Sequence, residues 1–338
     1  NSYVNADYQV SDDVEVFIDA IFSNTESFGR YAPPAAPGTM LASNPKNPFG
    51  QNVSGYFRWT DIGTRDNVVN DTLIDVNVGM RADLSDALSF EAYYTYSDYR
   101  STSIGKYYLS YGGFAENVLY DISDLDTYNA NLKATTLNDD RQNLQKLFAG
   151  LQWNMFEMAG GMASTYFAVE TFDVDYRADV DAQSEAGLVG GSAGNSAQGD
   201  RSVKALSVET ILPVTDYLTI DAAVRYDDYD DFGSEVSPRL GATFTMIDNL
   251  VVKASYGQGF RAPDLSDLYG ATAFSASSGT DYYGCQLDGV AEADCPDRQF
   301  DTYIGSNPDL GAETSETMSF GMEYTYDDNW VGSVNYVI

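Results

Sequence analysis

The sequence contains no histidine, and this absence excludes several kinds of chemistry at once. A serine or cysteine nucleophile usually needs an imidazole base, and most zinc sites use imidazole or a set of thiolates. The two cysteines, Cys285 and Cys295, do not have the spacing of a zinc site. We therefore expect no catalytic residue, no metal site and no cofactor, and we predict that the protein is not an enzyme.

Basic residues are also scarce, since 18 Lys and Arg stand against 51 Asp and Glu, a net charge of -33. This balance excludes nucleic acid as a partner, because phosphates require a basic surface. It fits long solvated loops. A salt-rich habitat or divalent-cation binding by the loops would give the same composition, and both interpretations stay open.

The sequence has no run of about 18 apolar residues, so it predicts no transmembrane helix. A membrane is not excluded, because barrels span it with strands of about ten alternating residues. A signal peptide does not open the chain either. Asn1 leads straight into the strand-like stretch 3–10, and Ile338 lies inside another such stretch, so we expect a segment of a longer protein.

Cys285 and Cys295 lie in one loop-like segment and are close enough to close a small loop. Such a disulfide needs an oxidising compartment, such as the periplasm or the cell surface. If formed, it stabilises the loop by roughly 3 kcal/mol through chain entropy. Two free thiols in a reducing cytosol are the alternative.

Alternation with a period of two residues is the dominant pattern in what the sequence does contain. From 217 to 229, apolar side chains alternate with polar ones: Leu218, Ile220, Ala222, Val224 and Tyr226 against Thr219, Asp221, Arg225 and Asp227. The same pattern recurs over residues 88–97, 250–260 and 317–326. Each stretch predicts a strand with one apolar face and one polar face.

The connections between these stretches are mostly short and long in turn. Short connections lie near residues 11–13, 84–87, 213–216, 248–249 and 327–329, and long ones near 27–71, 102–143, 178–200 and 261–312. Short periplasmic turns and long extracellular loops give membrane barrels this rhythm. The sequence thus predicts an all-β protein, an antiparallel up-and-down transmembrane β-barrel in part, with about twelve strands and long extracellular loops.

The expected strands cover residues 3–10, 14–26, 72–83, 87–101, 144–156, 162–177, 201–213, 217–229, 235–247, 250–260, 313–326 and 330–338. Residues 53–70 are expected to add a hairpin outside the membrane. The proline-rich segment 33–48 predicts a surface loop, because proline lacks the donor that a central strand needs. Tyrosines near strand ends predict a girdle at the membrane–water interface, namely Tyr93, Tyr94, Tyr96, Tyr99, Tyr226, Tyr229, Tyr324 and Tyr326.

Three groups of residues carry a resemblance to a known family. They are Ala223-Val224-Arg225-Tyr226-Asp227-Asp228-Tyr229, then Gly259-Phe260-Arg261-Ala262-Pro263 followed by Leu268-Tyr269, and then Asn307-Pro308-Asp309-Leu310 with Glu313-Thr314-Ser315. Together they resemble the barrel motifs of TonB-dependent outer-membrane receptors. The resemblance is sharp over residues 200–326 and weaker before them.

The resemblance implies a Gram-negative outer-membrane barrel of about 22 strands with a plugged lumen. Residues 1–338 would be one domain, a barrel fragment without the plug, the TonB box or the C-terminal strands. The implied function is active import of a scarce nutrient: an iron–siderophore, cobalamin, an oligosaccharide or a peptide. The implied partners are the TonB–ExbB–ExbD system, acting through the missing N-terminal region, the small ligand, and the surrounding lipid and lipopolysaccharide.

Arg261 lies where a strand meets the longest late loop, so we expect it to face the lumen or the plug in a charge-assisted contact, or to pack at the strand end. The loop 264–310 is the first candidate for ligand contact, because loops on a rigid scaffold often carry recognition. Its candidate contact residues are Tyr282, Tyr283, Gln286 and Arg298. A structural lid without ligand contact is the alternative.

Three other classes stay open at this point. A passive porin or barrel adhesin would have neither plug nor TonB box. A barrel hydrolase would need a set of catalytic residues, and the common sets include a histidine, which this sequence lacks. A soluble β-sandwich would bury the apolar strand faces against each other in a dry core, whereas a membrane barrel turns them outward.

Overall fold

The alternating stretches form strands in the computed structural model, which describes the chain except residues 41, 44–46, 114–131, 191, 193, 248 and 328–329. The described residues contain a 13-stranded antiparallel sheet, and β9 (Val189–Gly190) pairs with β6 beside its main path. The main path is β1 (Ser2–Ser11), β2 (Val14–Tyr31), β5 (Arg65–Ser85), β6 (Leu88–Ser110), β7 (Lys133–Met158), β8 (Gly161–Val180), β10 (Ala197–Thr215), β11 (Leu218–Tyr229), β12 (Gly233–Ile247), β13 (Leu250–Arg261), β16 (Glu313–Asp327) and β17 (Trp330–Val337). This path confirms the predicted order of strands.

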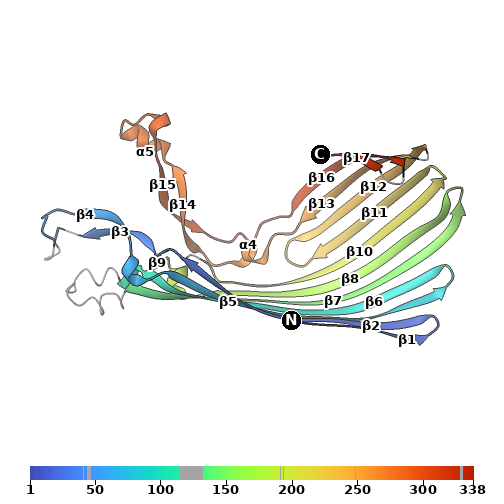
Figure 1. Ribbon diagram of the computed structural model, residues 1–338, viewed down its shortest axis with the longest axis horizontal. Coiled ribbons are helices and arrows are strands. Elements are labelled where there is room, and N and C mark those ends of the chain that lie inside the picture. The colour runs from blue at the N-terminus through green and yellow to red at the C-terminus, as the bar shows by residue number, and fades with distance from the viewer. Residues whose placement is uncertain are drawn as a thin grey trace.

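The strands follow one another up and down through the sheet, as the sequence predicts. The short turns gather at one end of the sheet and the loops at the other, the right and left ends of Figure 1. The turns at 248–249 and 327–329, and the centre of the connection 102–143, lie in part outside the described residues. Among the described residues, no helix reaches the length and apolar character that a membrane-spanning helix needs.

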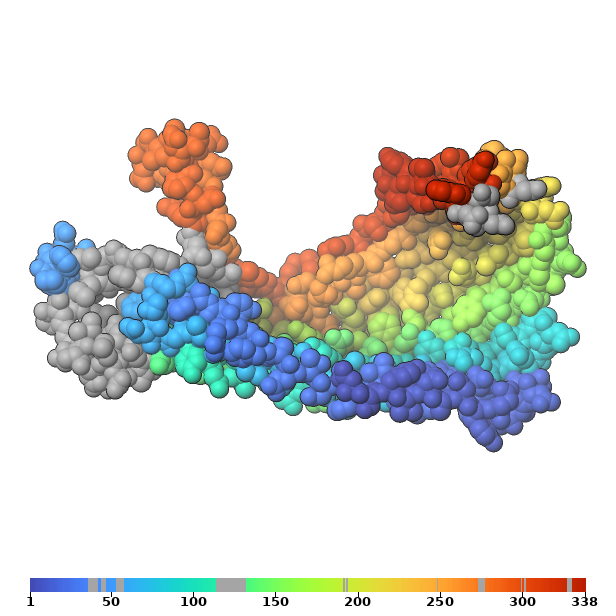
Figure 2. Space-filling model, viewed as in Figure 1, coloured from blue at the N-terminus to red at the C-terminus, as the bar shows by residue number. Residues whose placement is uncertain are grey.

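The sheet is a single curved layer, and Figure 2 shows it as an open trough. One row of paired residues crosses six strands of its convex face: Met80, Ala92, Ala149, Val169, Leu206 and Tyr226. Val169 and Leu206 in this row are 52% and 49% exposed. Apolar faces in the described chain thus point outward and do not meet in a sealed interior, which excludes the soluble sandwich.

The structure corrects two sequence predictions at the loop end. Strands β5, β6 and β7 run well beyond their predicted ends, so the connections 27–71 and 102–143 contain less loop than predicted. The expected hairpin at 53–70 is instead formed by β3 (Ala35–Met40) with β4 (Val53–Arg58), and 65–70 belong to β5. The extensions of β6 and β7 were missed because residues such as Thr102, Asn138 and Asp139 have a composition that favours loops, although they are paired in the sheet.

The side of the sheet that carries apolar residues changes along the strands. On β8, Phe167 and Val169 face outward, but Asp173 and Asp175, nearer the loops, lie on this same face. The outward face of β6 and β7 near the loops carries two ion pairs, Arg100–Asp139 and Arg141–Asp98, both at 2.8 Å. A polar outer face belongs in water, so we place the edge of the membrane near Thr171 of β8.

The structure places the tyrosines of the predicted girdle on both faces of the sheet. Tyr94, Tyr226 and Tyr324 share the outward face with the apolar rows. Tyr93, however, stacks on Phe148 on the concave face with ring centres 4.6 Å apart. Adjacent residues of a strand face opposite ways, so clustering in sequence alone cannot place a tyrosine on the lipid side.

The loop end holds the remaining elements: η1 (Thr60–Ile62), α3 (Ala182–Glu185), α4 (Leu265–Tyr269), β14 (Ala273–Thr280), α5 (Tyr282–Leu287), η2 (Glu292–Asp294) and β15 (Asp297–Ile304). Strands β14 and β15 form a hairpin that rises from the sheet and carries α5 at its tip (Figure 1). A small apolar core also lies here, where Ile62, Leu109 and Leu132 pack together. This core joins η1 and residue 132 to the loop end of β6.

Candidate ligand site at the loop end of the lumen

The concave face of the sheet becomes apolar towards the loops, opposite to the outward face. Phe172, Val174 and Tyr176 of β8 line this part of the concave face, and Gln142 of β7 is the register partner of Tyr176. Alternation makes this arrangement necessary, because Asp173 and Asp175 between them point to the water outside. The result is an apolar wall inside the mouth of the barrel.

Helix α4 covers this wall and fixes the start of the long late loop (Figure 1). Leu265 and Leu268 of α4 are buried, and the Ala271 N–H donates to the Ser196 carbonyl at 2.7 Å. The Tyr269 ring lies against Gly199, where a Cβ atom would come within 2.6 Å of the ring. The root of the loop is therefore docked on the loop end of β10.

Arg201 of β10 joins three segments at this root. Its Nε donates to Asp231 at 2.7 Å, and its Nη2 donates to the Pro263 carbonyl at 2.8 Å. Its guanidinium also lies 5.4 Å from the centre of the Tyr229 ring. Arg201 and Asp231 are both nearly buried, so this charge-assisted contact ties the β11–β12 turn and the loop entrance to the wall.

A cavity of about 410 Å³ remains between α4 and the wall, a volume suited to a small ligand. It is lined by Gln142, Phe172, Val174, Tyr176, Arg201, Tyr229, Asp264, Leu265 and Ser266. Burial raises the pKa of Tyr176, and the charges of Asp140 and Asp264 raise it further. The walls of the cavity are therefore largely aromatic, and its two charged lining residues, Arg201 and Asp264, are each held in an ion pair.

Deeper in the lumen, four charged residues form a chain across β7, β8 and β11. Lys146 Nζ lies 3.0 Å from Glu170, Arg225 also pairs with Glu170, and Arg225 Nη2 lies 2.7 Å from Asp227. Strand β10 lies between β8 and β11 and presents Ala205 and Ser207 on this face. Their short side chains leave room for Glu170 and Arg225 to meet across β10. This alternating chain of charges braces the wall from inside.

A second cavity of about 470 Å³ lies at the opposite end of the lumen, beside the short turns. Carboxylates dominate its lining, namely Asp12, Asp13, Glu15, Asp83 and Glu91, and Arg81 is paired with Glu15 at 3.0 Å. Among the described residues, no group of three or more Asp, Glu or Cys side chains is arranged to hold a metal ion. We take the cavity at the loop end as the candidate site because aromatic rings line it, whereas carboxylates line the second cavity.

Arg261 and the motif that follows it lie at the root of the late loop. Arg261 and the lumen-facing Ser255 are an even number of residues apart on β13, so Arg261 lies on the lumen face of the strand. Arg261 pairs with Asp264 at 2.6 Å and with Glu313 at 3.3 Å. Its charge-assisted contacts are thus made to its own loop entrance and to β16. Within the motif, Phe260 packs edge-on against Tyr229, and Leu268 and Tyr269 hold α4 on β10.

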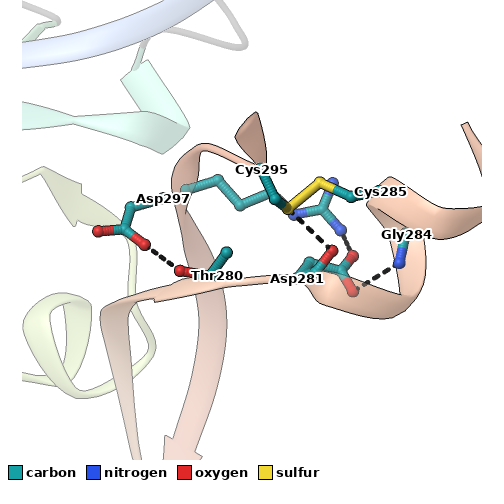
Figure 3. Close-up of a disulfide and its surroundings, with 7 residues drawn as sticks. Thr280, Asp281, Gly284, Cys285, Cys295 and Asp297 are labelled. Atoms are coloured by element: carbon teal, nitrogen blue, oxygen red, sulfur yellow. Dashed lines mark hydrogen bonds and ion pairs between the residues drawn. A yellow bond between two sulfur atoms is a disulfide. The ribbon is translucent and has the colours of Figure 1, made fainter. Parts of the chain in front are cut away.

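The other four predicted contact residues lie in α5 and at the start of β15, the tip of the hairpin in Figure 1, and none of them lines the cavity. There Cys285 and Cys295 form a disulfide, and Asp281 accepts a hydrogen bond from the Gly284 N–H at 2.9 Å and pairs with Arg298 (Figure 3). Tyr282 and Tyr283 are exposed on α5. The structure gathers Tyr282, Tyr283, Gln286 and Arg298 into one tip, but it does not bring them to Arg261.

Sequence reasoning missed the residues that line the cavity, above all Arg201, Phe172 and Tyr176. The sequence does contain a signal for Phe172 and Tyr176. Along β8, the apolar residues of the alternating pattern stand at odd positions up to Val169 and at even positions after it. For Arg201 no such signal exists, because its partners Asp231 and Pro263 are 30 and 62 residues away in the chain.

The fold has known counterparts among solved structures. The RagAB peptide transporter matches 99% of this chain and 39% of its own at a TM-score of 0.58, with 13% sequence identity. A ferric enterobactin receptor, PfeA, solved in complex with BCV-L6, matches 98% of this chain and 50% of its own at a TM-score of 0.50. These likenesses concern the fold.

A sequence relative points to the same class of protein. The ferric enterobactin receptor PirA of Pseudomonas aeruginosa is 30% identical over 164 residues, which cover 44% of this chain and 20% of that receptor. The chain thus aligns with only part of the length of this relative. The family model described as TonB dependent receptor-like, beta-barrel matches residues 7–337. The chain belongs to the TonB-dependent receptor β-barrel family.

Proposed function

We propose that this chain forms barrel wall in an outer-membrane receptor that imports a scarce nutrient with energy from the TonB–ExbB–ExbD system. The observation that carries the proposal is the sidedness of the sheet, because an apolar convex face needs lipid and a polar concave face needs a filled lumen. Family membership supports the energised mechanism. Lipid and lipopolysaccharide would surround the wall.

We further propose that residues 1–338 are one domain and that the plug and the remaining strands come from other parts of a longer chain. The sheet supports this, since the backbone groups on the outer edges of β1 and β17 have no strand partner in the described chain. Such edges are not tolerated in lipid. The match to only 39% of the RagAB transporter chain agrees with this arrangement.

The nutrient is one of four kinds: an iron–siderophore, cobalamin, an oligosaccharide or a peptide. The names of two similar proteins, a ferric enterobactin receptor and a peptide transporter, favour the first and the last. A passive porin or a barrel adhesin is the alternative function, and it needs no energy source. Energy dependence therefore separates the two classes.

The test uses a bacterial strain in which the complete receptor is the one uptake route for the nutrient supplied. Growth is measured on each of the four nutrients in turn, at limiting concentration. We expect the receptor to support growth on one nutrient when TonB is present, and growth on it to cease when TonB is deleted. Equal growth with and without TonB would assign the protein to the passive class. A receptor variant that lacks its TonB-contact segment is the matched control.

A further inference from the structure

We propose that the cavity between α4 and strands β8, β10 and β11 binds an organic cation, an ammonium or guanidinium group carried by the imported nutrient. This inference rests on the proposed import function and narrows its substrate class. Three features support it: the aromatic walls of the cavity, the carboxylates beside it, and the ion pairs that already hold the basic residues around it.

The aromatic walls come first. Phe172, Tyr176 and Tyr229 line one small space, and the faces of aromatic rings attract cations within about 6 Å of the ring centre. Arg201 already occupies such a position over Tyr229. No cation in the described part of the chain lies over Phe172 or Tyr176, so these two rings are available to a ligand.

One carboxylate beside the cavity lacks an ion-pair partner among the described residues. Asp264 lines the cavity and pairs with Arg261, whereas Asp140 lies two residues from Gln142 on the same face of β7. Burial raises the pKa of Asp140, and Asp139 and Asp179 raise it further. Among the described ion pairs none involves Asp140. A positive group placed beside Tyr176 would compensate this half-buried charge.

The basic residues beside the cavity are already engaged. Arg201 is held by Asp231 and the Pro263 carbonyl, and Arg261 is held by Asp264 and Glu313. A ligand with several negative charges would have to break these pairs and approach Asp140 and Asp264. The cavity therefore disfavours a polyanionic chelate and favours a ligand with a positive group.

The test is a binding titration of the complete receptor in detergent with three probes: tri-arginine, tri-alanine and ferric enterobactin, an anionic chelate. We expect tri-arginine to bind about tenfold or more tighter than tri-alanine at low salt, with the advantage shrinking as salt rises. Ferric enterobactin should not compete with tri-arginine. Equal affinity for the two peptides, or tighter binding of the chelate in this cavity, would overturn the proposal.

Variants locate the binding. Asp140→Asn and Tyr176→Leu should each weaken tri-arginine binding about three- to tenfold, and Tyr176→Phe should retain it because the ring remains. Asp139→Asn is the matched control, since Asp139 is the next residue on the opposite face and pairs with Arg100. An equal loss in Asp139→Asn and Asp140→Asn would also overturn the proposal.

The outcome is separable from the proposed function. TonB-dependent growth on an anionic nutrient, without competition by tri-arginine, would contradict the cation site but agree with the proposed import function. Growth that does not need TonB would contradict the import function, and the titration would still report whether the cavity binds a cation.

Discussion

The two halves of β8 meet different surroundings on the same strand. Towards the short turns, Val169 faces outward and Glu170 faces the lumen. Towards the loops, Asp173 faces outward and Tyr176 faces the lumen. The backbone ladder to β7 and β10 continues unchanged through both halves, so the strand itself does not decide which side is apolar. What decides it is whether lipid or water lies outside.

The neighbouring strands repeat this change at corresponding heights. On the outward face, Tyr94 of β6 gives way to Asp98 and Arg100, and Leu147 of β7 gives way to Arg141. Because the change occurs on each of these strands, it marks a boundary across the wall. On the outward face, charged side chains on the short-turn side of that boundary are predicted to be unfavourable.

The largest expected effect comes from a charge placed below the boundary. Phe167→Arg puts a guanidinium on the lipid face, four residues from the boundary near Thr171, and should destabilise the folded barrel by about 2–4 kcal/mol, because a cation at membrane depth loses its hydration. Measured on the complete receptor, the folded fraction in outer membranes should fall, as read from heat-modifiable mobility on gels.

Asp173→Arg is the matched control for this variant. It lies on the same strand and face, six residues closer to the loops and above the boundary. We expect its folded fraction to remain close to that of the parent receptor. If both arginines are tolerated, the outward face at Phe167 does not contact lipid, and the comparison between the two halves fails.

The next largest effect is expected from loss of the disulfide at the hairpin tip, and it concerns the loops alone. Neither α5 nor η2 has a buried residue, so the tip has no apolar core to hold it. Replacing Cys285 and Cys295 with serine should cost the tip roughly 3 kcal/mol of local stability by releasing a short closed loop. Limited proteolysis should then cut within 281–298, while the melting temperature of the barrel stays the same. A lowered barrel melting temperature would contradict this separation.

The sequence predicts the wall well because one physical rule governs it. Wherever lipid lies outside, apolar and polar residues must alternate, and this rule places the wall strands β8, β10, β11, β12, β13 and β16 within about four residues of their observed ends. The short strands β9, β14 and β15 lie in segments that the sequence predicted as loops. The rule fails at the loop ends of β6 and β7, where Thr102, Asn138 and Asp139 are paired in a ladder although their composition favours loops. There the neighbouring strands override local preference.

The candidate site is less predictable, and its parts show why. The motif around Arg261 is local in sequence, and its place at the loop entrance follows from the strand that ends there. The cavity depends on Phe172 and Tyr176 meeting α4, which lies about 90 residues later in the chain. Contacts of that separation arise from tertiary docking, which a single sequence does not encode in any local pattern.

A smaller effect is expected from the chain of charges in the lumen. Glu170→Gln keeps the volume but removes the anion between Lys146 and Arg225, leaving two cations near each other on a largely buried patch. We expect a loss of about 1–2 kcal/mol, reduced from the fully buried case because Arg225 is partly exposed. Urea unfolding of the complete receptor measures this loss. Glu323→Gln, which faces Lys253 at 3.8 Å with both side chains exposed, should change little.

The smallest effect is the pH dependence of the outer ion pair on β6 and β7. Hydrogen bonds from Arg100 and Thr102 lower the pKa of Asp139 below its ordinary value. A lowered pKa in the folded state stabilises the fold at pH values above the unfolded pKa of about 3.9, and this contribution disappears as the pH falls through the folded pKa. Melting temperatures of the receptor and of Arg100→Gln should therefore differ at pH 7, and the difference should shrink as the pH falls below about 3.9. Since the pair is exposed, high salt should also shrink the difference at pH 7. A difference that does not shrink in acid would mean that Arg100 acts through packing and not through its charge.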